Sequence, residues 1–103
     1  MKPFPQTPEF LQAAKRIIWF KPPEEALADP IELMAYAMRA STDEDMALLL
    51  DHIGREGLVE AIDNAPPGIV TARSWSYWNA RIGRYPAPLQ PKRADRFSSD
   101  STR

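Results

Sequence analysis

Apolar residues recur along most of the chain at the spacing of an α-helix, and no stretch alternates apolar and polar positions as a half-buried strand would. The first predicted helix begins at the capping residue Thr7 and ends at Lys21, because the residue before a proline avoids helical backbone angles. A short turn of helix from Pro22 to Leu27 forms the corner after it. The pattern therefore predicts the all-α class.

Four further helices are predicted between capping residues and glycine or proline stops. They cover about residues 29–40, 43–54, 55–65 and 72–82. Asp29 and Glu32 form a capping box, in which each side chain is expected to bond the other residue's backbone N–H. The helix after Asp29 is apolar most of the way round, so we expect it at the centre of the fold. Gly54 is expected to supply the left-handed residue that ends the second of these stretches.

The predicted domain organisation is simple. Residues 7–84 are expected to form a single domain, a compact bundle of about five helices. Residues 85–93 read as an extended, proline-rich C-terminal arm, and residues 94–103 as a polar, serine-rich, disordered tail. In the last helix, Trp75 and Trp78 lie three positions apart and are expected in the core.

The composition excludes several classes of protein. The 103 residues contain no cysteine, one histidine and only four glycines, which removes disulfides, thiol chemistry and a glycine-rich phosphate loop. The one histidine, His52, is expected to be exposed near the end of a helix rather than to bind a metal. We therefore expect no enzyme activity, no catalytic residues, no metal and no cofactor.

The sequence predicts neither a membrane-spanning segment nor a secretory signal. The longest apolar run, residues 33–38, is far too short to cross a bilayer. The first eight residues carry prolines where a secretory signal needs an apolar core. A cytoplasmic protein that does not enter the membrane is expected.

Charge is strongly segregated along the chain, although the net charge is only −1. Residues 1–21 carry +3, residues 22–65 carry −9 and residues 66–103 carry +5. Two interpretations remain open: the basic ends lie against the acidic centre of the same molecule, or the acidic centre faces a partner.

The helical stretches before and after Gly54 invite comparison with a helix-turn-helix DNA reader. The second stretch carries Arg55 as its one base against Glu56, Glu60 and Asp63, so phosphates would be repelled. A helical hairpin that packs in the core is the better interpretation.

Candidate partner-binding residues fall into two groups. The first group is acidic and lies between the two basic segments: Asp43, Glu44, Asp45, Glu56 and Glu60. The second group combines arginines with tyrosines, residue types that are enriched at binding hot spots: Arg73, Tyr77, Arg81, Arg84 and Tyr85.

Two motifs carry a family resemblance. The segments Ala65-Pro66-Pro67-Gly68-Ile69 and Arg73-Ser74-Trp75-Ser76-Tyr77-Trp78, with the runs 26–30 and 41–45, resemble a family of small bacterial proteins. The genes of that family often lie beside a nucleotidyltransferase of the abortive-infection toxin type. The resemblance covers about residues 17–93 and departs at Thr71-Ala72, where relatives more often carry Asp-Pro, a change that keeps a helix cap.

This resemblance implies an antitoxin that binds and neutralises a nucleotidyltransferase toxin, and it transfers no catalytic residues. In that hypothesis the acidic helices face a basic cleft of the toxin, while Tyr77, Arg81, Arg84 and the proline-rich arm hold its edge. One alternative is a nucleic-acid-binding adaptor or autorepressor that uses the basic C-terminal segment. Another is a homo-oligomeric structural module.

Overall fold

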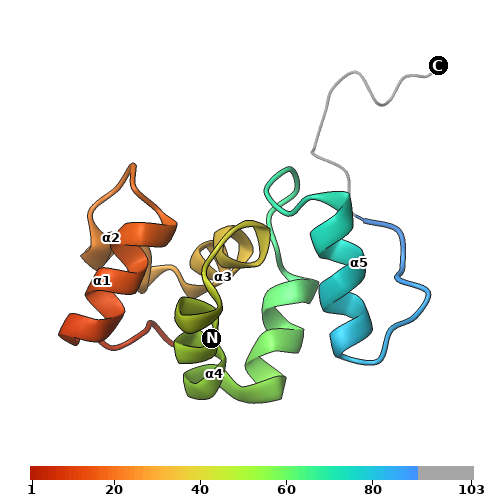
Figure 1. The fold of residues 1–103 in the computed structure, drawn as a ribbon, viewed down its shortest axis with the longest axis horizontal. Coiled ribbons are helices and arrows are strands. Elements are labelled where there is room, and N and C mark those ends of the chain that lie inside the picture. The colour runs from red at the N-terminus through yellow and green to blue at the C-terminus, as the bar shows by residue number, and fades with distance from the viewer. Residues whose placement is uncertain (91–103) are drawn as a thin grey trace.

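The computed structural model describes residues 1–90, and its secondary structure is entirely helical in this range. Five helices follow one another along the chain: α1 (Pro8–Ile17), α2 (Pro23–Ala28), α3 (Pro30–Arg39), α4 (Asp43–Asp63) and α5 (Ala72–Arg81) (Figure 1). The prediction of an all-α protein with about five helices is confirmed. The end of the predicted arm, 91–93, and the predicted tail, 94–103, lie outside the described residues.

Side-chain caps start three of the helices where the sequence predicts them. Asp29 Oδ1 accepts a hydrogen bond from the backbone N–H of Glu32 at 3.2 Å. Thr42 and Thr71 cap α4 and α5 in the same way, at 3.1 and 3.2 Å. The reciprocal half of the predicted capping box is absent, because the Glu32 carboxylate accepts instead from Lys21 Nζ at 2.6 Å.

Helix α1 is shorter than predicted. It ends at Ile17, and Ile18 already has extended backbone angles. Pro22 sets only an upper limit to the helix, and the chain turns inward before that limit is reached. The turn buries Ile18 completely and leaves Trp19 exposed.

Helix α4 contains a sharp kink at the position where the sequence predicts a break. Gly54 has φ 68° and ψ −175°, a conformation that is essentially restricted to glycine. In Figure 1 the first half of α4 descends to this point and the second half rises away from it. The predicted break between two helical stretches is confirmed, whereas their packing as a helical hairpin stays a prediction.

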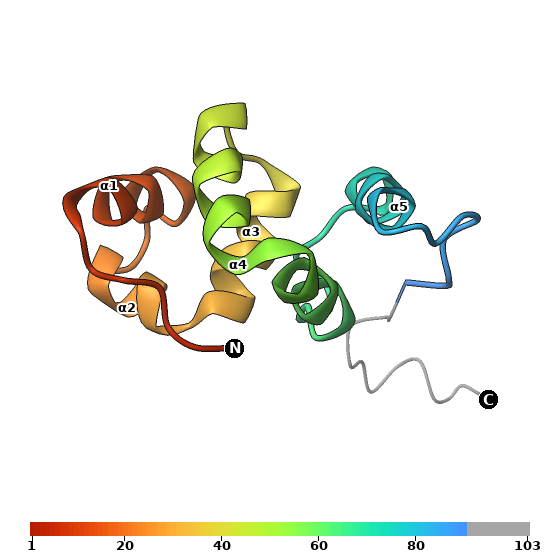
Figure 2. The same cartoon turned by 90° about the horizontal axis from the view of Figure 1, so that it is seen from below.

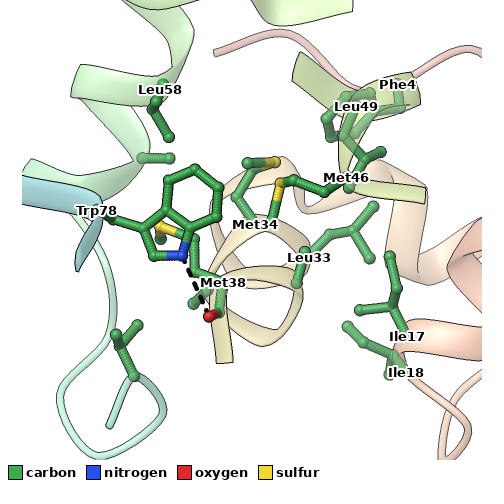
Figure 3. Close-up of a cluster of buried hydrophobic side chains, with 14 of the residues drawn as sticks. Phe4, Ile17, Ile18, Leu33, Met34, Met38, Met46, Leu49, Leu58 and Trp78 are labelled. Atoms are coloured by element: carbon green, nitrogen blue, oxygen red, sulfur yellow. Dashed lines mark hydrogen bonds between the residues drawn. The ribbon is translucent and has the colours of Figure 1, made fainter. Parts of the chain in front are cut away.

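Helix α3 lies at the centre of the fold, as its apolar character predicts. It contacts each of the other four helices, with α1 and α2 at one end of the molecule and α5 at the other (Figure 2). Its side chains Leu33, Met34 and Ala35 are fully buried. Figure 3 shows this core, including Trp78, whose indole N–H donates to the Met38 carbonyl at 3.3 Å. Trp75 is also buried, so the predicted core role of both tryptophans is confirmed.

The first part of the predicted C-terminal arm lies against its own domain. Trp75 Nε1 donates a hydrogen bond to the Pro88 carbonyl at 2.8 Å. The Gln90 side-chain amide donates to the Val70 carbonyl, which precedes α5. The described part of the arm is therefore hydrogen-bonded to α5 and to the segment that precedes it.

Candidate partner-binding groove

An open groove of about 510 Å³ lies where the end of α3 and the start of α4 face α5. Three exposed arginines line it: Arg39 from α3 and Arg73 and Arg81 from α5. Its one acidic side chain is Asp43, the first residue of α4. The remaining lining includes buried apolar side chains, among them Met38, Met46 and Trp78. We call this feature the arginine groove.

Two aromatic rings orient one of these arginines. Tyr77 and Trp78 lie edge to face with their ring centroids 5.0 Å apart. The guanidinium carbon of Arg81 is 5.3 Å from the Trp78 centroid and 5.8 Å from the Tyr77 centroid, and its Nη1 donates to the Tyr77 hydroxyl at 3.0 Å. These cation–π contacts hold the guanidinium at the groove while its charge remains available.

The arginine groove carries uncompensated positive charge. None of the ion pairs among residues 1–90 involves Arg39, Arg73 or Arg81. Three positive charges therefore face one carboxylate, that of Asp43. Such a surface favours a ligand that brings carboxylates or phosphates, both of which the guanidinium group binds with paired hydrogen bonds.

The structure divides the acidic candidates. Asp43 and Glu44 are exposed in the first turn of α4 and Glu56 is exposed in its second half. Asp45 is instead buried and accepts two hydrogen bonds from the Arg16 guanidinium, at 2.9 and 2.7 Å. It is therefore not part of the exposed acidic surface that the sequence suggested, because long-range pairing with α1 takes it inward. Glu60 is exposed but accepts from the amino group of Met1 at 2.7 Å.

The basic and aromatic candidates divide as well. Arg73, Tyr77 and Arg81 come together in the arginine groove. Arg84 makes a two-bond ion pair with Asp63 at 2.6 and 3.2 Å, which lowers the pKa of that carboxyl and ties the end of α5 to α4. Tyr85 is 87% exposed and lies outside the groove lining.

Part of the charge that is segregated along the sequence is paired within the molecule. Each of the four ion pairs found within the described residues joins a basic group of residues 1–21 or 66–90 to a carboxylate of residues 22–65. The interpretation in which basic ends lie against the acidic centre therefore holds for these pairs. The exposed carboxylates of Asp43, Glu44 and Glu56 and the arginines of the groove make no ion pair within residues 1–90.

Four residues in or near the arginine groove were not predicted as site residues from the sequence: Arg39, Trp19, Phe20 and Tyr36. Arg39 is isolated in the sequence and joins the other arginines only through the packing of α3 against α5. Trp19, Phe20 and Tyr36 form a contiguous aromatic cluster, with centroid distances of 5.7 and 5.4 Å between successive rings. A signal was present for Trp19, which falls off the apolar stripe of the predicted first helix, whereas Phe20 lies three positions after Ile17 and continues that stripe.

Other candidate chemistry is sparse in the part of the chain that the structure covers. His52 is exposed, as predicted, and packs against the rings of Phe4 and Phe10 at 5.5 and 5.4 Å. Within residues 1–90, no three acidic or histidine side chains converge in a way that could hold a metal ion. No described helix combines the length and apolar character needed to cross a membrane.

Comparison of the chain with models of known protein families, with curated proteins and with solved structures found no match. The resemblance carried by the motifs at residues 65–69 and 73–78 therefore stays a prediction from the sequence.

Proposed function

We propose that this protein is a small protein-interaction module that binds its partner through the arginine groove. The observation that carries the proposal is the grouping of three arginines without ion-pair partners among residues 1–90 beside the exposed ring of Tyr77. Arginine and tyrosine are enriched at the centres of protein interfaces because they combine apolar area with directional hydrogen bonds. Among the basic side chains of residues 1–90 outside the groove, Arg16, Lys21 and Arg84 make ion pairs.

The partner in this proposal is a nucleotidyltransferase of the toxin type, and the protein is its antitoxin. The family resemblance supports this choice, and the charge distribution supports a mechanism. The exposed carboxylates of Asp43, Glu44 and Glu56 face a basic substrate cleft of the toxin, and the arginine groove holds an acidic part of its rim. Nucleotide or RNA is then kept out of the cleft by the bound protein.

Co-expression with the gene beside its own tests this function. The two proteins are expected to co-purify, and this chain is expected to restore growth that the neighbouring gene product arrests. Reversing charge in the groove with Arg73→Glu and Arg81→Glu together is expected to abolish both effects, because the acidic rim would meet new negative charge. Absence of co-purification and of growth rescue by the unmodified chain would refute the antitoxin function.

A matched control distinguishes an effect of the groove from an effect of the protein's net charge. Lys2→Glu together with Lys15→Glu makes the same change of net charge at two exposed positions outside the groove lining. Its co-purification and rescue are expected to equal those of the unmodified chain. Circular dichroism of each variant shows that the helices are intact, as expected for substitutions of exposed side chains.

A nucleic-acid-binding adaptor or autorepressor is the second candidate, and the arginines of the groove favour it too. Phosphates would occupy the positions that carboxylates take in the first proposal. This candidate predicts that affinity for the DNA upstream of its own gene, or for RNA, falls steeply as salt is added. Flat salt dependence, or no binding at low salt, would eliminate it.

A further inference from the structure

The turn between α1 and α2 presents two large aromatic side chains to solvent. Trp19 is 82% exposed and Phe20 is 48% exposed. Phe20 lies edge to face with Trp19 on one side and with Tyr36 of α3 on the other. We call Trp19, Phe20 and Tyr36 the aromatic corner. Its tryptophan differs from Trp75 and Trp78, which are buried, so the core does not account for it.

A second hollow adjoins the arginine groove on the side of α1, and the residues that line it are close in the chain to the aromatic corner. This hollow has a volume of about 340 Å³ and is lined by residues of the α1 end and of the α3–α4 connection, including Arg16 and Ile17. Ala40 and Ser41 line both the hollow and the arginine groove. Tyr36 stands one helical turn before Ala40, and its carbonyl accepts the Ala40 N–H at 3.0 Å.

From these contacts we infer that the aromatic corner and the arginine groove form one docking surface for an acidic segment of a partner protein. Carboxylates of the segment bind Arg39, Arg73 and Arg81, and an apolar side chain of the same segment packs on Trp19 and Phe20. The inference rests on the proposed protein-interaction function and adds the chemistry of the bound segment and the second contact region.

The charges along this surface favour a peptide over a nucleic acid. A single strand carries a phosphate at every nucleotide, and a strand that follows the groove would bring phosphates against Asp43 and the neighbouring Glu44. An acidic peptide can place carboxylates at the arginines and neutral residues elsewhere. It also supplies an apolar side chain to pack on the exposed Trp19 ring, a residue type enriched at interface hot spots.

Selection from a library of random linear peptides displayed on phage, with the full chain immobilised, tests the inference. The enriched peptides are expected to be acidic and to share an aromatic or aliphatic anchor. Synthetic copies are then titrated by fluorescence anisotropy. Trp19→Ala, and separately Arg73→Glu with Arg81→Glu, are each expected to weaken binding at least about tenfold, the effect of losing a hot spot.

The control is Gln12→Ala, a truncation at another exposed position on α1 that lines neither hollow. It is expected to leave affinity unchanged. Because Trp19 is mostly exposed, its replacement is expected to preserve the thermal unfolding midpoint, and that measurement confirms that lost binding reflects lost contact.

Several results would overturn the inference. Failure to enrich any peptide, enrichment without acidic residues, or unchanged affinity after Trp19→Ala would each do so. If a labelled single-stranded RNA binds and its binding depends on Trp19, the surface binds a nucleic acid rather than a peptide. If sedimentation shows a dimer that Trp19→Ala disrupts, the surface binds a second copy of the chain.

The outcomes also separate this inference from the antitoxin function. If the neighbouring nucleotidyltransferase co-purifies equally well with Trp19→Ala, the docking surface is wrong and the antitoxin function stands. If the nucleotidyltransferase never co-purifies with this chain, but the selected acidic peptides bind only when Trp19 and the groove arginines are present, the docking surface stands and the antitoxin function fails.

Discussion

Arg16 and Asp45 join the end of α1 to the first turn of α4 through two hydrogen bonds, at 2.9 and 2.7 Å. The Asp45 side chain is only 4% exposed, whereas that of Arg16 is 56% exposed. The hydrogen bonds from Arg16 hold the pKa of Asp45 below its ordinary value of 3.8, although burial acts in the opposite direction. This pair anchors α1 beside the hollow that leads to the arginine groove.

The Asp45 pair predicts a specific pH dependence of stability. A carboxyl whose pKa is lowered by folding stabilises the protein above its unfolded pKa, and this contribution is lost as pH falls through the folded pKa. Asp45→Asn is expected to lower the free energy of unfolding at neutral pH by about 1.5–3 kcal/mol, the range for a hydrogen bond to a charged group. The difference from the unmodified chain is expected to shrink below pH 3.8. Urea unfolding across this pH range measures it.

Asp51→Asn is the control for that experiment, because Asp51 is exposed on the same helix and makes no ion pair in the described structure. It is expected to change stability by less than about 0.5 kcal/mol. An equal loss in both variants, or a loss for Asp45→Asn that is constant with pH, would show that the pair does not stabilise the fold.

The kink of α4 predicts a strong requirement for glycine. Gly54→Ala is expected to reduce the free energy of unfolding by about 1–3 kcal/mol, because alanine is strained at the backbone angles of Gly54. Nothing lies within 4 Å of the added methyl group, so the cost is conformational rather than steric crowding by neighbours. Thermal unfolding measures the loss, with Asp51→Ala as the control in a regular turn of the same helix. A neutral Gly54→Ala would mean that the kink is not maintained in solution.

The contact between Trp75 and Pro88 predicts how the arm is held. Trp75→Phe keeps an aromatic ring in the core and removes the indole N–H that donates to the Pro88 carbonyl. Backbone amides of the arm up to Gln90 are expected to move more freely on the picosecond-to-nanosecond timescale in this variant, while those of α3 are unchanged. Heteronuclear NOEs of the backbone amides, measured by NMR, check this. Equal NOEs in both proteins would show that the hydrogen bond does not hold the arm.

The three tryptophans predict a simple fluorescence signature. Trp19 is 82% exposed, whereas Trp75 and Trp78 are 9% and 8% exposed. Acrylamide is therefore expected to quench one component of the emission readily and the rest poorly. Trp19→Phe is expected to remove the readily quenched component. If the quenching curve of this variant equals that of the unmodified chain, Trp19 is not exposed in solution.

Local features of the chain were readable without the fold. The caps at Asp29, Thr42 and Thr71 and the break at Gly54 occur where the sequence places them. Each depends on groups within a few residues of one another, such as a side-chain oxygen and a nearby backbone N–H. The central position of α3 followed from its apolar character, because a helix without a polar face is stable only when it is surrounded.

The candidate site could be predicted only in part. Arg73, Tyr77 and Arg81 share one exposed face of α5, and their helical spacing already implies this. Arg39 carries no local signal that ties it to them, because 34 positions separate it from Arg73 and only the packing of α3 against α5 brings them together. The acidic run at the start of α4 gave no sign that Asp45 alone would turn inward.

By itself the sequence determined the helical class, most helix boundaries and the kink, because backbone hydrogen bonding, proline geometry and glycine angles act over a few residues. Tertiary structure alone decided which charges of residues 1–90 pair with one another and which do not. It drew Asp45 to Arg16 and Asp63 to Arg84, and it left Arg39, Arg73 and Arg81 together in one groove. The physical reason is that an ion pair depends on the distance between groups that the chain separates by tens of residues, and only the packed helices set that distance.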